Sequence, residues 1–285
     1  MPELPEVETT KNGIAPFILN QEFEKIIVRQ EQLRWKIPRQ LNNILKSNKV
    51  ISIERRAKYI LIRINNHGSL LIHLGMSGSL QILSPDQITP AQKHDHVDFI
   101  FTNHYLMRYT DPRRFGAILW LDLENPLEHK LLKHLGPEPL SKIFSSNYLF
   151  KKINHKNTSI KQAIMDSKIV VGVGNIYANE ALFLSHIRPD RLAKSLSIEE
   201  INLLTKNIKI ILKQAIKQGG TTLKDFKNSD GKPGYFKQEL LVYGRKNQAC
   251  LRCSEQDKSQ NKNKFLLKEI RQNNRSSILC ENCQH

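Results

Sequence analysis

The placement of the four cysteines restricts the fold most, because all four lie within the last 36 residues. They form two Cys-x2-Cys pairs, Cys250 with Cys253 and Cys280 with Cys283. Each pair presents two thiolates from one turn, and two such turns close a tetrahedral zinc site. Disulfides are the alternative, which a cytoplasmic chain disfavours. We therefore predict one structural Zn²⁺ held by four cysteines, with no open position for catalysis.

The first part of the chain, roughly from Lys49 to Leu121, has the pattern of β-strands. In the run 58–64, Ile60, Ile62 and Ile64 alternate with residues of the opposite face. Similar short runs follow at Leu70–Leu74, Ser79–Leu83, Val97–Phe101, Leu106–Thr110 and Ala117–Leu121. Short strands at this close spacing, separated by polar turns, predict an antiparallel sandwich or barrel.

Beyond Asn125–Pro126 the pattern becomes helical. The expected helices are Leu127–Leu135, Ile160–Met165, Ile176–Leu184 and Ile198–Gln218, the last with a capping box at Ser197 and Glu200. Thr221–Tyr235 reads as a loop, and the polar stretch Ser254–Lys264 reads as an exposed insertion. The sequence thus predicts an α+β multidomain chain: a β domain over 1–126, a helical domain over 127–240 and a cysteine module over 241–285.

The charge of the chain points to a polyanionic partner. Lys and Arg number 44 against 27 Asp and Glu, a formal charge of +17. Nucleic acid is favoured over an anionic membrane surface, because the basic helix expected over Ile198–Gln218 lacks a Trp-rich apolar face. There is no run of eighteen apolar residues and no signal-peptide pattern at the N-terminus, so a cytoplasmic protein is expected.

The N-terminal stretch MPELPEVE is acidic in an otherwise basic chain. One interpretation is a helix near 5–18, since Pro is tolerated in the first turn and Glu complements the helix dipole there. The other is chemical: without Met1, Pro2 becomes a secondary amine with a pKa of roughly 8, a nucleophile near neutral pH. Glu3 could then move the proton that attack on an aldehyde-like carbon requires.

Several short motifs admit two interpretations each. The turn before the helix of Gly172–Phe183 either packs closely or presents a helix N-terminus to a phosphate. In HLGMSG and DPRRFG, Met76, Arg113 and Phe115 are either core filler and turn residues or a wedge that enters a base stack. Lys58 in RRAKYI is either solvated or bound to a phosphate.

Taken together, these motifs resemble the formamidopyrimidine-DNA glycosylase family over nearly the whole chain. The shared blocks, in order, are PELPEVE, RRAKYI, HLGMSG, KHDHVDF, YTDPRRFG, SIKQAIMD with VVGVGNIYANE, VYGR and the two cysteine pairs. The resemblance implies an N-terminal β-sandwich, a helical domain with a helix–two-turn–helix motif and a zinc finger. It also implies a monomeric enzyme that removes 8-oxoguanine and formamidopyrimidines from duplex DNA and then nicks the strand by β,δ-elimination.

The resemblance assigns roles to individual positions. Pro2 matches the nucleophile that forms a Schiff base, Glu3 the general acid/base, and Glu6 a neighbour of the lesion pocket. Lys58 matches a residue that assists elimination and contacts a phosphate, and Arg275 a phosphate contact for the δ step. Among the DNA-binding positions, Met76, Arg113 and Phe115 match the void-filling wedge, whereas His94, Lys156 and Asn175 match DNA-backbone contacts. The loop 221–235 matches a lid over the flipped base.

The chain departs from the family's pattern at two points, and two other functions stay open. The 26 residues between Cys253 and Cys280 exceed the usual gap, and RSSILC replaces a Gly/Thr-rich version, so the finger's tip is expected to differ. The first rival is the endonuclease VIII-like branch, which prefers oxidised pyrimidines. PELPE and the wedge in DPRRFG favour the purine branch. The second is a non-catalytic zinc-ribbon DNA-binding protein, which would leave Pro2 and Glu3 without a role.

Overall fold

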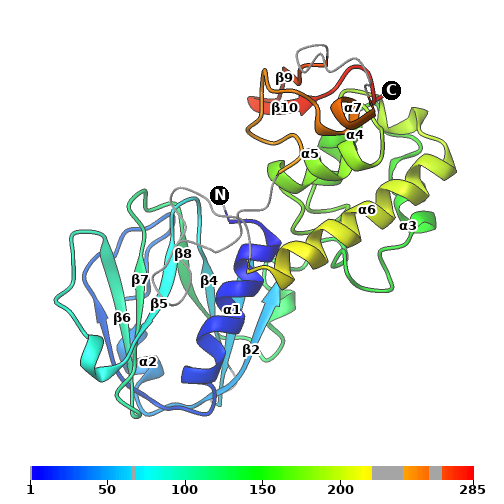
Figure 1. The fold of residues 1–285 in the computed structure, drawn as a ribbon. Coiled ribbons are helices and arrows are strands. Elements are labelled where there is room, and N and C mark those ends of the chain that lie inside the picture. The colour runs from blue at the N-terminus through cyan, green and yellow to red at the C-terminus, as the bar shows by residue number, and fades with distance from the viewer. Residues whose placement is uncertain (1, 66–67, 220–239, 257–264) are drawn as a thin grey trace. The chain divides into compact units, whose positions relative to one another are not determined.

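The computed structural model describes residues 2–65, 68–219, 240–256 and 265–285. The chain divides into two compact units (Figure 1). The first contains the described residues up to His134 together with residues 216–219 at the end of α6, and the second contains Leu135–Ala215 together with the described residues from 240 onward. Each unit is described by itself below.

The first unit is built on two four-stranded antiparallel sheets, so the predicted sandwich is confirmed. One sheet has the order β1-β6-β7-β5 and the other β2-β3-β4-β8. The strands are β1 (Phe23–Val28), β2 (Val50–Arg56), β3 (Tyr59–Ile64), β4 (Ser69–His73), β5 (Ser79–Leu83), β6 (Asp95–Phe101), β7 (Leu106–Thr110) and β8 (Ala117–Leu121). The unit also contains helices α1 (Leu4–Ile18) and α2 (Leu41–Leu45) and the 3-10 turns η1 (Pro85–Gln87) and η2 (Pro126–Glu128).

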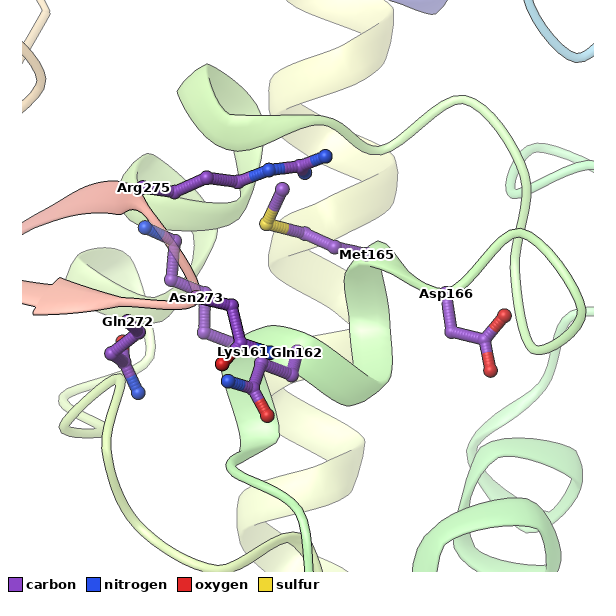
Figure 2. Close-up of a pocket in the computed structure, with 7 residues that line it drawn as sticks. All are labelled: Lys161, Gln162, Met165, Asp166, Gln272, Asn273 and Arg275. Atoms are coloured by element: carbon purple, nitrogen blue, oxygen red, sulfur yellow. The ribbon is translucent and has the colours of Figure 1, made fainter.

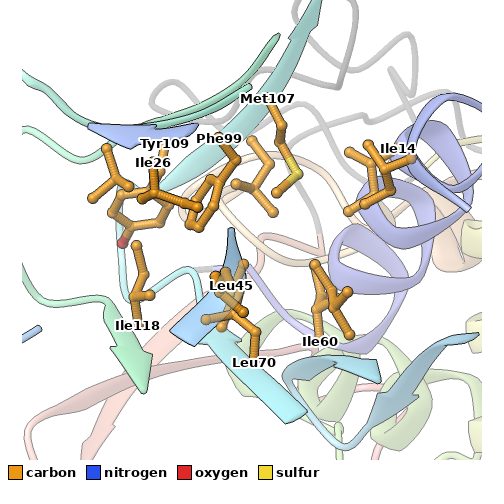
Figure 3. Packing of buried hydrophobic residues seen from close by; sticks show 14 of the residues in the cluster. Ile14, Ile26, Leu45, Ile60, Leu70, Phe99, Met107, Tyr109 and Ile118 are labelled. Carbon is orange, nitrogen blue, oxygen red and sulfur yellow. The ribbon is translucent and has the colours of Figure 1, made fainter. Parts of the chain in front are cut away.

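The core of this unit lies between the two sheets (Figure 3). Ile60 and Leu70 of one sheet and Phe99 and Met107 of the other are all fully buried. Helix α1 contributes Ile14 to the same cluster. The alternation predicted for β3 is therefore the alternation that fills the core, and burial of these side chains fixes the register of the strands.

The second unit is helical and ends in a β-hairpin. Its elements are α3 (Ser146–Ile153), α4 (Ile160–Met165), α5 (Asn175–Leu184), η3 (Ala193–Ser195), α6 (Ile198–Lys217), α7 (Leu251–Gln256), β9 (Lys268–Gln272) and β10 (Arg275–Leu279). The predicted capping box of α6 is present, since Ser197 N donates to Glu200 Oε2 at 2.8 Å and Glu200 N donates to Ser197 Oγ at 3.2 Å. Strands β9 and β10 pair antiparallel.

The helix predicted over 127–135 is wrong, because only the 3-10 turn η2 forms there. Asn125 caps this turn by accepting a hydrogen bond from Leu127 N at 3.1 Å, and His129 then turns extended, with ψ of 141°. Leu127 is 46% exposed whereas Leu132 is buried, so the leucines lack the common buried face that an amphipathic helix needs. Strand β1 and helices α2, α3 and α7 were not predicted from the sequence.

Two predicted features fall on residues that the structure does not describe. The loop over 221–235 lies wholly outside the described residues, and the insertion over 254–264 lies mostly outside them. None of the helices within the described ranges is long and apolar enough to cross a membrane. The predicted domain boundaries near residues 126 and 240 stay predictions.

Candidate functional site

The N-terminal block is buried at the start of α1. Pro2 is buried, and Glu3 and Glu6 are 2% and 0% exposed. Glu3 is the N-cap of the helix and forms a reciprocal capping box with Glu6, in which Glu3 N donates to Glu6 Oε2 at 2.8 Å. The helix start inferred from the sequence is therefore present, and it holds Pro2 and the Glu3 carboxylate in one local arrangement.

Lys58 lies at the turn between β2 and β3, beside a histidine that sequence analysis did not single out. His73 is paired with Tyr59 across β3 and β4, with ring centroids 5.0 Å apart. Burial, and then the positive charges of Lys58 and Arg34, lower the pKa of His73 to about 4. Its Nδ1 accepts a hydrogen bond from Gly75 N at 3.0 Å, which requires the neutral ring. A polar residue at the end of the apolar strand β4 was the available signal.

A buried carboxylate joins the two loops that carry the wedge candidates. Asp111 is fully buried, and its Oδ1 accepts from Ser77 Oγ at 2.7 Å. Its Oδ2 accepts from Gly116 N at 2.8 Å and from Tyr109 OH at 3.2 Å. Gly75 adopts φ +64°, and a Cβ there would lie 2.4 Å from Gly116 N, so the two loops touch at their backbones.

The structure therefore brings Met76, Arg113 and Phe115 together. Met76 is 37% exposed and Phe115 is 49% exposed. The Arg113 guanidinium lies 5.0 Å above the ring of Phe115, within reach of a cation–π interaction. His94 adjoins this loop pair, because Asp111 N donates to the His94 carbonyl at 3.0 Å. Met76, Arg113 and Phe115 thus give the two joined loops exposed apolar and cationic side chains.

In the second unit, Asn175 is the first residue of α5 and follows the N-cap Gly174. Gly172 has φ +81°, so the turn before the helix uses the conformational freedom of glycine there. Lys156 is half-buried just after α3, and its carbonyl accepts from Lys194 N at 3.3 Å. Asn175 therefore lies at a helix N-terminus and Lys156 lies in the segment that follows a helix.

Arg275 is exposed at the start of β10 and lines a pocket of about 240 Å³ between the hairpin and α4 (Figure 2). Lys161 of α4 lines the same pocket and is almost fully buried. Its Nζ donates to Ser276 O and to Ser277 Oγ, both at 2.7 Å. Lys161 thus anchors strand β10, which begins at Arg275, by two hydrogen bonds.

Two buried polar residues of α5 anchor the C-terminal segment as well. Asn179 Oδ1 accepts from Ile278 N at 2.8 Å. The Glu180 carboxylate accepts from the backbone amides of Leu241, Val242 and Tyr243 at 2.7–2.9 Å. Burial raises the pKa of Glu180, although these three hydrogen bonds oppose the increase. Asn179 and Glu180 lie in the NIYANE block, whose sequence pattern predicted no role for either residue.

The four cysteines form a closed, buried cluster. Their sulfurs all lie within 4.8 Å of one another, with Cys250 to Cys283 at 3.8 Å and Cys253 to Cys280 at 3.7 Å. Disulfide sulfurs would lie ~2.05 Å apart, whereas tetrahedral ligands ~2.3 Å from zinc lie about 3.8 Å apart. The cluster therefore has the ligand set and spacing of a four-cysteine metal site. The predicted disulfide alternative does not fit these distances.

Known proteins resemble this chain over its whole length. Residues 1–118 match the family model described as the formamidopyrimidine-DNA glycosylase N-terminal domain, and residues 135–227 match that of the family's H2TH domain. The formamidopyrimidine-DNA glycosylase of Marinomonas sp. (strain MWYL1) is 53% identical over 285 residues, covering all of both chains. The chain belongs to the formamidopyrimidine-DNA glycosylase family. The predicted enzyme class, a DNA glycosylase of the glycosylase/lyase type, is thereby confirmed.

Solved structures agree with this membership of the formamidopyrimidine-DNA glycosylase family. The Lactococcus lactis Fpg in complex with DNA containing an abasic site has a TM-score of 0.88 and 30% identity, covering 99% of each chain. MutM in complex with carbocyclic 8-oxo-G containing DNA has a TM-score of 0.87 and 30% identity over all of both chains. The predicted fold, a β-sandwich followed by a helical region and a four-cysteine cluster, is confirmed.

Asp111 gives a stability prediction for this glycosylase. Asp111→Asn keeps the shape of the side chain but replaces one acceptor oxygen by an amide that faces donors. We expect unfolding of the first unit to become easier by ~2–4 kcal/mol, because buried donors lose their partner. Urea unfolding followed by tryptophan fluorescence reports on this unit, since both tryptophans, Trp35 and Trp120, lie in it.

A matched control is Glu31→Gln, which removes an exposed carboxylate paired with Arg39 in the same unit. Exposed ion pairs contribute ~0–1 kcal/mol, so this variant is expected to unfold like the parent protein. An Asp111→Asn protein whose urea midpoint equals that of Glu31→Gln would contradict the structural role of Asp111.

Proposed function

We propose that this protein excises oxidised purines, 8-oxoguanine and formamidopyrimidines, from duplex DNA and then cleaves the abasic strand. The observation that carries the proposal is the buried Pro2–Glu3 block, held by the capping box with Glu6 in a chain of net charge +17. The related proteins solved with abasic-site DNA and with 8-oxo-G DNA support the choice of substrate.

The proposed nucleophile is the secondary amine of Pro2 after removal of Met1. Its nitrogen bonds to the sugar C1′ as the bond to the damaged base breaks, and the base leaves with a proton. The C1′–O4′ bond of this adduct then breaks, O4′ takes up a proton, and an iminium forms between the nitrogen and C1′. The iminium is permanently cationic because the amine is secondary, so it withdraws electrons and acidifies the C2′ proton. Glu3 lies next in the chain and serves as general acid/base for these proton transfers.

Strand cleavage then follows by two eliminations. Loss of the C2′ proton breaks the C3′–O bond, and a further proton loss breaks the C5′–O bond. We assign Lys58 to assistance of elimination and to a phosphate contact, and Arg275 to a phosphate contact during the second step. Arg275 is exposed on β10, and Lys58 lies at the turn between β2 and β3, where its positive charge acts on the neighbouring His73.

The remaining candidates are assigned to DNA binding. Met76 and Phe115 would fill the space that the extruded nucleotide leaves, with Arg113 facing the orphaned cytosine; their exposure on the loop pair supports this role. His94, Lys156 and Asn175 would contact the DNA backbone. We further propose that Cys250, Cys253, Cys280 and Cys283 hold one structural Zn²⁺, which would stabilise the hairpin that carries Arg275, and that the enzyme acts as a monomer.

The test is to mix the protein with duplex DNA carrying 8-oxoguanine opposite cytosine and to add borohydride. Reduction of the iminium is expected to give a covalent protein–DNA adduct that survives denaturing electrophoresis. Mass spectrometry should locate the adduct at Pro2. The matched control is the same duplex with guanine in place of 8-oxoguanine, which should give no adduct.

Other outcomes would select a rival. An adduct with a thymine-glycol duplex but none with 8-oxoguanine would place the protein in the endonuclease VIII-like branch. Tight binding without an adduct on either lesion or on a plain abasic site would favour a non-catalytic DNA-binding protein. An adduct that maps to a lysine would refute Pro2 as the nucleophile.

A further inference from the structure

The turn that leads into Lys58 has a backbone conformation that most residues avoid. Ala57 joins β2 to β3 with φ +56°, in the left-handed region, and it is 4% exposed. A side chain with a Cβ disfavours this region, and glycine would adopt it more readily. Contacts with surrounding residues must therefore stabilise this conformation of Ala57. The direction of the next residue, Lys58, depends on that conformation.

Arg55 supplies that hold. Its Nη1 donates to the Ala57 carbonyl at 2.9 Å, while its Nε donates to Glu8 Oε2 at 2.5 Å. The second oxygen of Glu8 accepts from Lys11 Nζ at 2.6 Å. The Arg55 and Glu8 side chains are only 10% and 18% exposed, so solvent screens the pair weakly.

Glu8 belongs to α1, the helix that begins at the Pro2–Glu3 block, and α1 runs beside β2 (Figure 1). Burial alone would raise the pKa of Glu8, but the hydrogen bonds from Lys11 and Arg55 outweigh burial and hold the pKa below its ordinary value. Glu8 is therefore ionised at neutral pH. The contacts form a continuous path from α1 through Glu8 and Arg55 to the turn before Lys58.

We propose that Arg55 is a positioning residue, which Glu8 orients and which sets the place of Lys58 relative to the Pro2–Glu3 block. The proposal rests on the role of Lys58 in elimination given under the proposed function. It requires the fork of the arginine side chain, because one group must reach both the Glu8 carboxylate and the Ala57 carbonyl. A lysine at this position could pair with Glu8 but could not make both contacts in that geometry.

The test is a double-mutant cycle of Arg55→Met and Lys58→Ala, with single-turnover cleavage of a preformed abasic site as the readout. Arg55→Met alone is expected to slow cleavage about tenfold, because small misplacements of catalytic groups cost that much or more. In the Lys58→Ala background, Arg55→Met should slow cleavage by less than about twofold, since the side chain that Arg55 positions is already absent. Arg55→Lys keeps the pair with Glu8, and we expect it to be slowed like Arg55→Met.

Two controls separate positioning from general loss of structure. Arg63→Met removes another arginine of the same sheet, one that donates to Glu124 O far from this turn, and should cleave like the parent protein. Ala57→Gly relieves the strained turn, so adding it to Arg55→Met should restore part of the lost rate.

Each outcome decides the proposal. Equal slowing by Arg55→Met in both backgrounds would show a merely structural effect and overturn it. Full activity of Arg55→Met beside a slow Lys58→Ala protein would also overturn it while leaving the proposed function intact. A Lys58→Ala protein as fast as the parent would instead refute the role of Lys58 itself, and the positioning role with it.

Discussion

Pro2→Gly is expected to lower the yield of borohydride-trapped adduct by at least about 100-fold. The substitution changes both the type of the nucleophilic amine and its position. The amine becomes primary, so its imine can lose a proton and no longer holds a permanent positive charge. Glycine also lacks the ring that is buried at the start of α1, so the amine loses its fixed direction. Trapping on a preformed abasic duplex measures this step without the excision step.

The control for this variant is Pro5→Ala, which replaces the other proline of the block and leaves the N-terminal amine unchanged. Ala is a good helix former at this position within the first turn of α1, so trapping should stay close to that of the parent protein. Binding of both variants to DNA with a reduced abasic analogue should be similar. A Pro2→Gly protein that traps as efficiently as Pro5→Ala would contradict the proposed mechanism.

Cys280→Ser is expected to remove the metal and to weaken DNA binding at least about tenfold. A serine hydroxyl is a poor replacement for a thiolate, and structural zinc sites contribute folding free energy of ~10–16 kcal/mol in finger peptides. Strand β10, which carries Arg275, ends directly before Cys280, so the loss of the site loosens this strand. Elemental analysis should find one zinc per parent chain and close to none in the variant.

The DNA affinity of the Cys280→Ser protein should also depend less on salt. Each lost phosphate contact lowers the slope of log affinity against log salt concentration by about one. Ser254→Ala, which changes the neighbour of Cys253 but none of the four thiols, is the matched control and should retain both zinc and affinity. Unchanged zinc content after Cys280→Ser would contradict a four-cysteine site.

Features set by local pattern could be predicted from the sequence. Strands β3 to β8 alternate in period two or form short apolar runs, and the capping box of α6 has both partners three residues apart. The missed strand β1 breaks the alternation because a bulge between Phe23 and Lys25 shifts its register. Helix α3 did carry a signal that was overlooked, since Ser145 caps it and Leu149 and Ile153 form its buried face.

The contacts that hold the candidate site could not be predicted in this way. Asp111 reaches back to Ser77, and Lys161 reaches forward to the carbonyl of Ser276. The sequence shows only that these residues are polar or charged, and such residues are usually exposed. Whether they are buried, and beside which distant partner, depends on the packing of both segments.

By itself the sequence determined the order of strands, helices and cysteine pairs, and the chemistry available at Pro2 and Glu3. Those features depend on residue type and on short spacing, which folding does not alter. Only the tertiary structure decided that the two wedge loops share one carboxylate and that Arg55 links α1 to the turn before Lys58. The physical reason is that a buried polar group is stable only with a hydrogen-bond partner, and the partner is chosen by packing in three dimensions.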